Sequence, residues 1–232
     1  MTSPAPLLVL TPYFPPAELA GGPARTLDAM IRHSTPETVE ACSVLTSAYD
    51  LTTHEPMDVP LDTMTEHRGV RVLYVSGGTH RRLFAIARAR SLRPRVLYLN
   101  SLWHPAFSIV PLLLHRMGWW GRARCVVAPR GELSVGLVGP RARRKRAVIL
   151  LVRGLGLDTR VTWHASTTDE KSHIQRYFPR ADVSVHENET LLPADPEPPT
   201  RRGGAQRTVT FLSRLAERKG AHRLLGAAAH LS

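Results

Sequence analysis

The sequence has few cysteines and no long apolar segment. Its 232 residues include two cysteines, Cys42 and Cys125, each in its own apolar run. This spacing predicts buried free thiols in a reducing compartment, and no metal motif. Apolar runs such as 105–114 and 147–152 are shorter than the ~20 residues that cross a bilayer. Because the N-terminus also carries no basic leader, we expect a cytoplasmic protein without an integral membrane segment.

Several enzyme motifs are absent as well. The sequence contains no H-E-x-x-H, no G-x-S-x-G, no G-x-G-x-x-G and no Walker-type lysine loop. Metallopeptidase, hydrolase and dinucleotide-binding hypotheses therefore have no support from short motifs.

Lysine is scarce, whereas arginine is abundant. The chain has three lysines among 31 basic residues, and its net charge is +12. Such a charge attracts phosphates, nucleic acid or an anionic leaflet, and by itself it does not say which. Aromatic residues make up 6% of the chain and do not alternate with the arginines, as they do in single-strand nucleic-acid grooves. We therefore expect no nucleic-acid partner.

Short β-like runs alternate with helix-length segments along the chain. The predicted strands are 7–11, 39–46, 70–75, 95–100, 124–128, 161–165 and 182–186. One helix is predicted to begin at Pro23, and four others to cover 79–92, 105–117, 140–155 and 167–178. Residues 47–69 are predicted to form a long loop. Single helices between strands indicate an α/β fold, a Rossmann-like doubly wound parallel sheet. In such sheets ligands bind beyond the carboxyl ends of the strands.

The composition changes near residue 190. Residues 191–206 are rich in Pro and Gly, which predicts a linker. After it, 207–215 reads as a strand and 221–231 as a helix. One strand and one helix cannot bury their apolar faces alone. We therefore expect a first domain over 1–190 and, over 207–232, the opening βα unit of an incomplete second Rossmann-like domain.

Two loops that follow predicted strands carry polar residues suited to ligand binding. Gly21 and Gly22, with Arg25, lie at the start of a predicted helix, where backbone amides and the helix N-terminus favour an anion; a plain strand-to-helix turn is the alternative. Asn100, Trp103 and His104 follow another strand and could hold sugar hydroxyls, with the indole on a sugar face. The alternative there is a helix N-cap beside a buried aromatic residue.

Two further loops place cations at strand ends. Arg130, followed by Gly131, is suited to a phosphate or a carboxylate; a surface salt bridge from Arg130 to Glu132 is the alternative. Arg214 and Lys219, five positions apart, can converge on one diphosphate, with a charge-rich loop as the alternative. A basic run next to apolar residues also fits either an anionic membrane surface or a solvated helix end; it consists of Arg141, Arg143, Arg144, Lys145 and Arg146.

Taken together, these loops resemble a known family. LLVLTPYFPPAELAGGPARTL is similar to the start of family 4 (GT-B fold) glycosyltransferases, and the similarity continues through LYLNSLWHP, VVAPRGELS, WHASTTDEKSHI and FLSRLAERKGAHRLL. The resemblance implies two Rossmann-like domains that face each other across a cleft. The N-terminal domain would hold a glycan or lipid-linked acceptor, and the C-terminal domain would hold a nucleotide-sugar donor.

The resemblance also implies roles for individual residues. Gly21 and Gly22 match the loop near the donor diphosphate, and Arg214 with Lys219 match the cation pair that binds it. Arg130 falls beside the reacting sugar, and Ser166 with Glu170 match a structural element. The implied activity is a retaining sugar transfer that needs no metal and no cofactor, in surface polysaccharide or glycoconjugate synthesis.

Two departures from the family pattern stand out. HENETLLP replaces the family's Pro-Asn-Gly turn, and the family's paired glutamates belong downstream of Ser232, so we expect a truncated chain. The alternative is a non-catalytic remnant or binding module that recognises an acceptor glycan or a lipid surface. We also expect peripheral contact with the inner face of the plasma membrane through the basic run.

Overall fold

The computed structural model describes residues 5–134, 142–188, 210–212 and 220–229. The chain divides into two units, Met1–Leu191 and Leu192–Ser232. The predicted linker lies outside the described residues. Of the predicted strand 207–215, residues 210–212 are described, and they form no strand, because no described residue pairs with them. The helix predicted from Ala221 is α7 (Ala221–Ala228).

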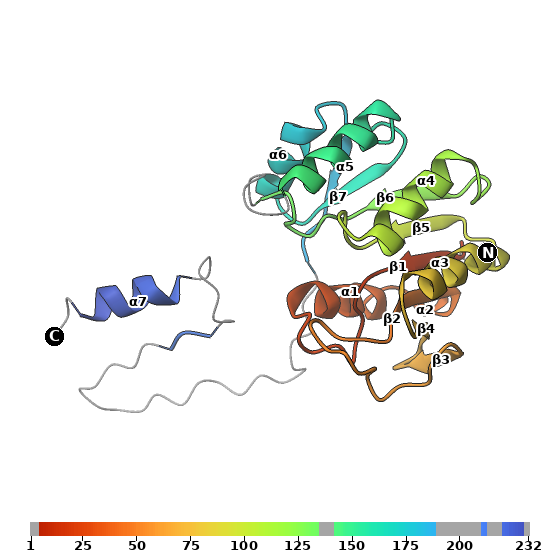
Figure 1. Cartoon of the computed structure of the whole chain (residues 1–232), viewed down its shortest axis with the longest axis horizontal. Coiled ribbons are helices and arrows are strands. Elements are labelled where there is room, and N and C mark those ends of the chain that lie inside the picture. Colours follow the sequence, from red (N-terminus) through yellow and green to blue (C-terminus); the bar gives the residue numbers. More distant parts are fainter. Residues whose placement is uncertain (1–4, 135–141, 189–209, 213–219, 230–232) are drawn as a thin grey trace. The chain divides into compact units, whose positions relative to one another are not determined.

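The first unit is an α/β fold around one eight-stranded sheet (Figure 1), as predicted from the sequence. The strand order is β3-β4-β2-β1-β5-β6-β7-β8, and all neighbours are parallel except β3 and β4. The strands are β1 (Leu7–Leu10), β2 (Cys42–Ser47), β3 (Met64–His67), β4 (Val70–Val75), β5 (Val96–Leu99), β6 (Arg124–Val127), β7 (Thr162–Ala165) and β8 (Asp182–Val185).

Helices connect the consecutive parallel strands, except β2 and β4. They are α1 (Gly22–Arg32), α2 (Pro36–Ala41), α3 (Thr79–Arg88), α4 (Val110–Arg116), α5 (Ala142–Gly154) and α6 (Thr168–Tyr177), with short turns η1 (Ala89–Leu92) and η2 (Pro105–Ile109). In the described ranges, no helix is both long and apolar enough to traverse a membrane.

The central strands β1 and β5 are continuous apolar runs because residues on both of their faces are buried. Leu8 and Leu10 pack with Ile86 of α3 on one face, whereas Val9 packs with Leu27 of α1 on the other. Both cysteines are buried free thiols, as predicted. The sheet therefore forms a rigid base for the loops at its edge.

The strand order places a topological switch at β1. The chain leaves β1 toward β2 on one side and later returns to β5 on the other side. Loops at the carboxyl ends of these two strands diverge, and such a point is where open α/β sheets bind ligands. Residues 11–13 and 100–104 occupy this position.

The predicted strand 39–46 begins too early. The structure has α2 up to Ala41, and β2 starts at Cys42. Thr35 caps this short helix by accepting from the backbone N–H of Thr38, and Pro36 occupies its first turn. A cap residue followed by proline is a helix-start signal, and this signal prevails over the β-branched residue Val39.

The predicted long loop 47–69 contains a strand. Met64 pairs with Leu73 and His67 pairs with Val70, so β3 and β4 form an antiparallel hairpin. Its turn residues, Arg68 and Gly69, have φ of 51° and 83°, as two-residue hairpin loops require. The prediction failed because an edge strand can be polar, and hydrophobic patterning does not detect it.

Candidate functional site

A carboxylate holds the loop that follows β5. The carboxylate of Glu132 accepts from the Ser101 hydroxyl over 2.9 Å and from the backbone N–H groups of Leu102 and Trp103 over 2.7 and 3.3 Å. The indole N–H of Trp103 in turn donates to the Glu132 carbonyl over 3.3 Å. Burial raises the pKa of Glu132. The alternative of a surface salt bridge between Arg130 and Glu132 is therefore wrong.

Arg130 is fixed by three neutral partners at the same edge. Its Nε donates to Asn100 Oδ1 over 2.7 Å, Nη1 donates to Asn188 Oδ1 over 2.6 Å, and Nη2 donates to the Tyr98 hydroxyl over 2.9 Å. A guanidinium has five N–H donors, so two remain for a ligand. The backbone of Arg130 has φ of 53°, a left-handed conformation that is unfavourable for a residue with a Cβ.

A directional chain of hydrogen bonds extends from Arg130 into the core. Because arginine has no acceptor atom, the Tyr98 oxygen accepts from it and the Tyr98 hydroxyl donates to His164 Nδ1 over 2.6 Å. The proton of the His164 ring then sits on Nε2, which faces the His186 carbonyl at 3.1 Å. Burial raises the pKa of Tyr98 to about 12 and lowers the pKa of His164. Both rings are thus neutral, and each hydrogen bond in the series donates in the direction from Arg130 toward the His186 carbonyl.

A second buried carboxylate holds the backbone next to Arg130. Glu170 is 5% exposed. Its Oε1 accepts from the Gly131 N–H over 2.6 Å, and its Oε2 accepts from the N–H and hydroxyl of Ser166 over 2.7 and 2.6 Å. Ser166 and Glu170 therefore connect the ends of β6 and β7, and they set the backbone that carries Arg130.

The edge of the sheet is hollowed into two adjoining cavities, which we call the edge groove; Glu132 lines one of them, whereas Arg130 lines neither. One of ≈ 650 Å³ is lined by Ser101, Trp103, His104, Glu132, Arg144 and Lys145, among others. The other, of ≈ 470 Å³, is lined by Ser47, Tyr49, Asp50, Thr53, Gly77 and Arg82, among others. Both cavities share Pro12, Tyr13 and His104. The groove combines aromatic surface with hydroxyls and cations, a lining suited to a sugar-bearing ligand.

His104 can donate a hydrogen bond into the groove but cannot act as a general base there. Its Nδ1 accepts from the backbone N–H of Phe107 over 3.2 Å and so caps η2. Burial, with the nearby charges of Arg82 and Arg144, lowers the pKa of His104 to about 4. The neutral ring therefore carries its proton on Nε2. The N-cap alternative for this loop is correct, and the capping role is compatible with a ligand contact.

The residues predicted to touch an acceptor divide into two groups. Trp103 and His104 line the edge groove. Asn100 is 4% exposed, and its amide is used internally, since Nδ2 donates to Thr11 Oγ1 over 3.3 Å while Oδ1 accepts from Arg130. Asn100 therefore positions Arg130 and is not placed to bind a sugar.

The basic run at the start of α5 serves the groove in part. Lys145 lies with Nζ 5.6 Å from the ring centroid of Trp103, and Arg144 also lines the groove. Arg143 and Arg146 are exposed, whereas Val148, Ile149 and Val152 are buried in the core. Arg141 lies outside the described residues, and so do Arg214 and Lys219.

Neither Gly21 nor Gly22 lines the edge groove. Gly21 has φ of 70° and caps α1, which carries no acidic residue in its first turn. Gly22 lines a separate cavity of ≈ 470 Å³ with Arg25 and Arg68, among others. The Asp50 carboxylate holds the loop by accepting from backbone N–H groups of residues 19 and 20.

The sequence analysis missed three residues of this site. Tyr98 reads as part of a strand, Asn188 as the residue before a linker, and Tyr13 as part of a proline-rich loop. Their positions at strand ends were the available signal, because such ends meet at one edge of a parallel sheet.

Neither a protein-family model, nor a curated protein, nor a solved structure matches the chain.

Proposed function

We infer that this chain provides the acceptor side of a family 4-type, GT-B fold glycosyltransferase, which transfers a sugar from a nucleotide-sugar to a glycan or lipid-linked acceptor in surface polysaccharide or glycoconjugate synthesis. The observation that carries the proposal is the edge groove, lined by Trp103, His104 and Glu132. Two residues before Glu132, Arg130 is held in a fixed orientation by Asn100 and Tyr98. The groove lies at the switch point of the sheet, where this fold binds ligands.

The groove supplies contacts for an acceptor. The Trp103 indole offers an apolar face to a sugar ring, and the Nε2–H of neutral His104 donates to a hydroxyl or an anionic oxygen. Arg144 and Lys145 make this end of the groove positive, which suits an acceptor that carries phosphate or a carboxylate. Peripheral attraction to an anionic membrane, through the same basic run, would bring a lipid-linked acceptor to this end.

Arg130 would act on the negative charge that develops on the leaving diphosphate, next to the reacting sugar. Its two remaining N–H groups are held in a fixed direction, so no reorganisation is needed as negative charge develops. Arg214 and Lys219 would bind the donor diphosphate and stabilise the departing nucleotide, and the amides of Gly21 and Gly22 would approach the same group. The proposed transfer is retaining and uses cations of the chain in place of a metal ion.

Donor binding tests the proposal. We expect one member of a panel of nucleoside diphosphate sugars, at millimolar concentration, to raise the melting temperature of the chain, because a ligand at 100 times its Kd stabilises the folded state by about 2.7 kcal/mol. Arg214→Ala and Lys219→Ala should each abolish the shift, whereas Arg218→Ala, the neighbouring control, should retain it. Unchanged donor affinity in both variants would overturn the assignment.

The same measurement distinguishes the enzyme from the second hypothesis, a non-catalytic binding module. A non-catalytic module would use the edge groove for a glycan or lipid headgroup and have no need of a donor. No thermal shift with any donor, together with glycan binding that Trp103→Ala abolishes, would favour that module over the enzyme.

A further inference from the structure

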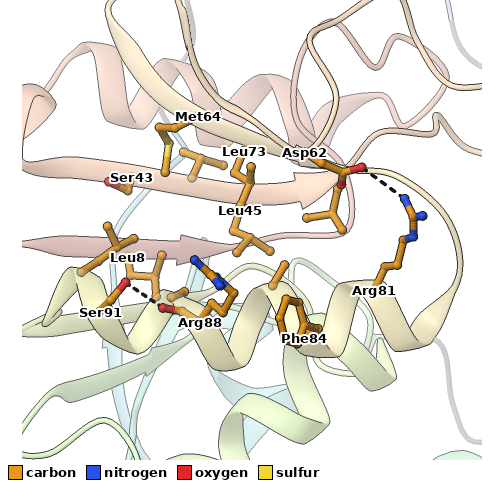
Figure 2. A pocket seen from close by; sticks show the side chains of 15 residues that line it. Leu8, Ser43, Leu45, Asp62, Met64, Leu73, Arg81, Phe84, Arg88 and Ser91 are labelled. Atoms are coloured by element: carbon orange, nitrogen blue, oxygen red, sulfur yellow. Dashed lines mark hydrogen bonds and ion pairs between the residues drawn. The ribbon is translucent and has the colours of Figure 1, made fainter.

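A cavity lies between α3 and the sheet, away from the edge groove. Its volume is ≈ 480 Å³, and β1, β2, β3, β4, α3 and η1 all contribute to its lining. Its walls are largely apolar, formed by Leu8, Leu45, Leu73, Val75, Ala85 and Leu92. Figure 2 shows Leu8, Leu45 and Leu73 on the strands facing the helix across this space.

The cavity exists because α3 covers only part of this face. The chain between β2 and β4 contains β3 and no helix, so no second helix from that connection packs beside α3. Leu45 and Val75 are buried, whereas Met64 is 41% exposed and Phe84 is 64% exposed. An apolar surface continues from the core to the solvent along this channel.

One cation faces the cavity without a counter-charge. The Arg88 side chain points from α3 toward the strands (Figure 2), with its guanidinium carbon 5.7 Å from the ring centroid of Phe84. Across the described ranges, no carboxylate forms an ion pair with it.

The acid in the lining has other partners. Asp62 Oδ1 accepts from the Ser76 N–H over 2.9 Å, and Asp62 Oδ2 lies 3.5 Å from Nη1 of Arg81. Because Asp62 is satisfied at its own end of the cavity, it does not neutralise Arg88.

We propose that this cavity binds an anionic amphiphile with a single alkyl chain. The alkyl chain of the ligand packs against the leucines of β1, β2 and β4 and against Ala85, which removes apolar surface from water. The phosphate or carboxylate at its end pairs with the Arg88 guanidinium, whose planar N–H groups match such oxygens. A neutral alkyl ligand would gain no charged contact with Arg88, which is exposed at the mouth of the cavity, and a polar anion without an alkyl chain would leave the apolar wall uncovered.

Matched ligands test both halves of the site. Octyl phosphate below its critical micelle concentration should bind the whole chain with 1:1 stoichiometry in calorimetry, about tenfold more tightly than octanol, because a charged hydrogen bond is added. Arg88→Gln should remove that difference. Arg90→Gln should leave it unchanged, since Arg90 lies over Trp119, 4.8 Å from its ring centroid, and does not line the cavity.

A second variant tests the apolar wall. Ala85→Leu fills the cavity while keeping a good helix former, so it should weaken octyl phosphate and octanol alike, with unchanged circular dichroism. No binding of octyl phosphate, or equal binding by wild type and both variants, would overturn the proposal. If inorganic phosphate competed as strongly as octyl phosphate, the proposal would be overturned too, because the alkyl chain would then contribute nothing to the affinity.

A further experiment distinguishes a membrane lipid from a free amphiphile as the ligand. Co-sedimentation with phosphatidylglycerol vesicles that Ala85→Leu weakens would identify a membrane lipid. Binding of soluble octyl phosphate without vesicle binding would identify a free amphiphile. Either result supports the site.

Discussion

The guanidinium of Arg130 donates to the side-chain carbonyl of Asn100 over 2.7 Å, although 30 positions separate them in the sequence. The bond joins the ends of β5 and β6, so the two loops beside the edge groove hold one another. Arg130 is thereby oriented before any ligand arrives, and its remaining N–H groups have a fixed direction.

The left-handed backbone at Arg130 should be a measurable strain. Arg130→Ala and Arg130→Gly both remove the guanidinium, but only glycine adopts φ of 53° without steric cost. We expect Arg130→Gly to be about 1 kcal/mol more stable than Arg130→Ala in urea unfolding. A glycine variant less stable than the alanine variant would show that the backbone there is unstrained.

Glu170 should be a major stabilising residue. Replacing it with glutamine leaves an amide nitrogen facing an N–H or hydroxyl of Gly131 or Ser166, because both carboxylate oxygens are acceptors in the native structure. We expect Glu170→Gln to lower the free energy of unfolding by about 3 kcal/mol. Glu40→Ala, at an exposed position, is the control and should change stability by less than about 0.5 kcal/mol. A similar loss in both variants would refute this role.

The hydroxyl of Tyr98 should matter more than its ring. Tyr98→Phe keeps the buried shape but leaves Arg130 Nη2 and His164 Nδ1 without their shared partner. We expect a loss of about 2 kcal/mol in unfolding free energy. Tyr177→Phe is the matched control, because no described residue forms a hydrogen bond with that hydroxyl, and it should be near neutral. Equal effects would argue against the hydrogen-bond chain.

The sequence carried the outline of this site but not its connections. Consecutive apolar runs located β1, β5 and β6, and loop composition placed Arg130, Trp103 and His104 at strand ends. The partners of Arg130 were not predictable from pattern, because Asn188 lies 58 positions away and hydrogen bonds between loops depend on the register of the whole sheet. Asn100 was assigned to the ligand for the same reason.

Stability should fall as the solution becomes acidic. The pKa of His104 is lowered from 6.5 to about 4, so the folded protein favours the neutral ring and the unfolded chain binds more protons below pH 6.5. The contribution of His104 to the free energy of unfolding is therefore fully present above pH 6.5 and is lost as the pH falls toward 4. This loss is about 3 kcal/mol at most.

The substitution His104→Asn isolates the contribution of this histidine to the pH dependence. In His104→Asn the side-chain oxygen can still accept from the Phe107 N–H, so the variant should fold and show a shallower decline between pH 6.5 and 4 in urea titrations. His164, whose pKa is also lowered by burial, should account for part of the remaining slope. His80→Asn, at an exposed position, should keep the wild-type slope, and an identical slope in His104→Asn would contradict the assignment.

The most direct test of the account is release of nucleoside diphosphate from a nucleotide-sugar in the presence of extracted glycolipid and oligosaccharide acceptors. We predict release coupled to a new glycosidic bond with the donor's anomeric configuration, and a drop of about 100-fold in kcat for Arg130→Ala, the size reported for loss of one preorganised donor to developing charge. No transfer by the wild-type chain with any donor, or transfer at the same rate by Arg130→Ala, would contradict it.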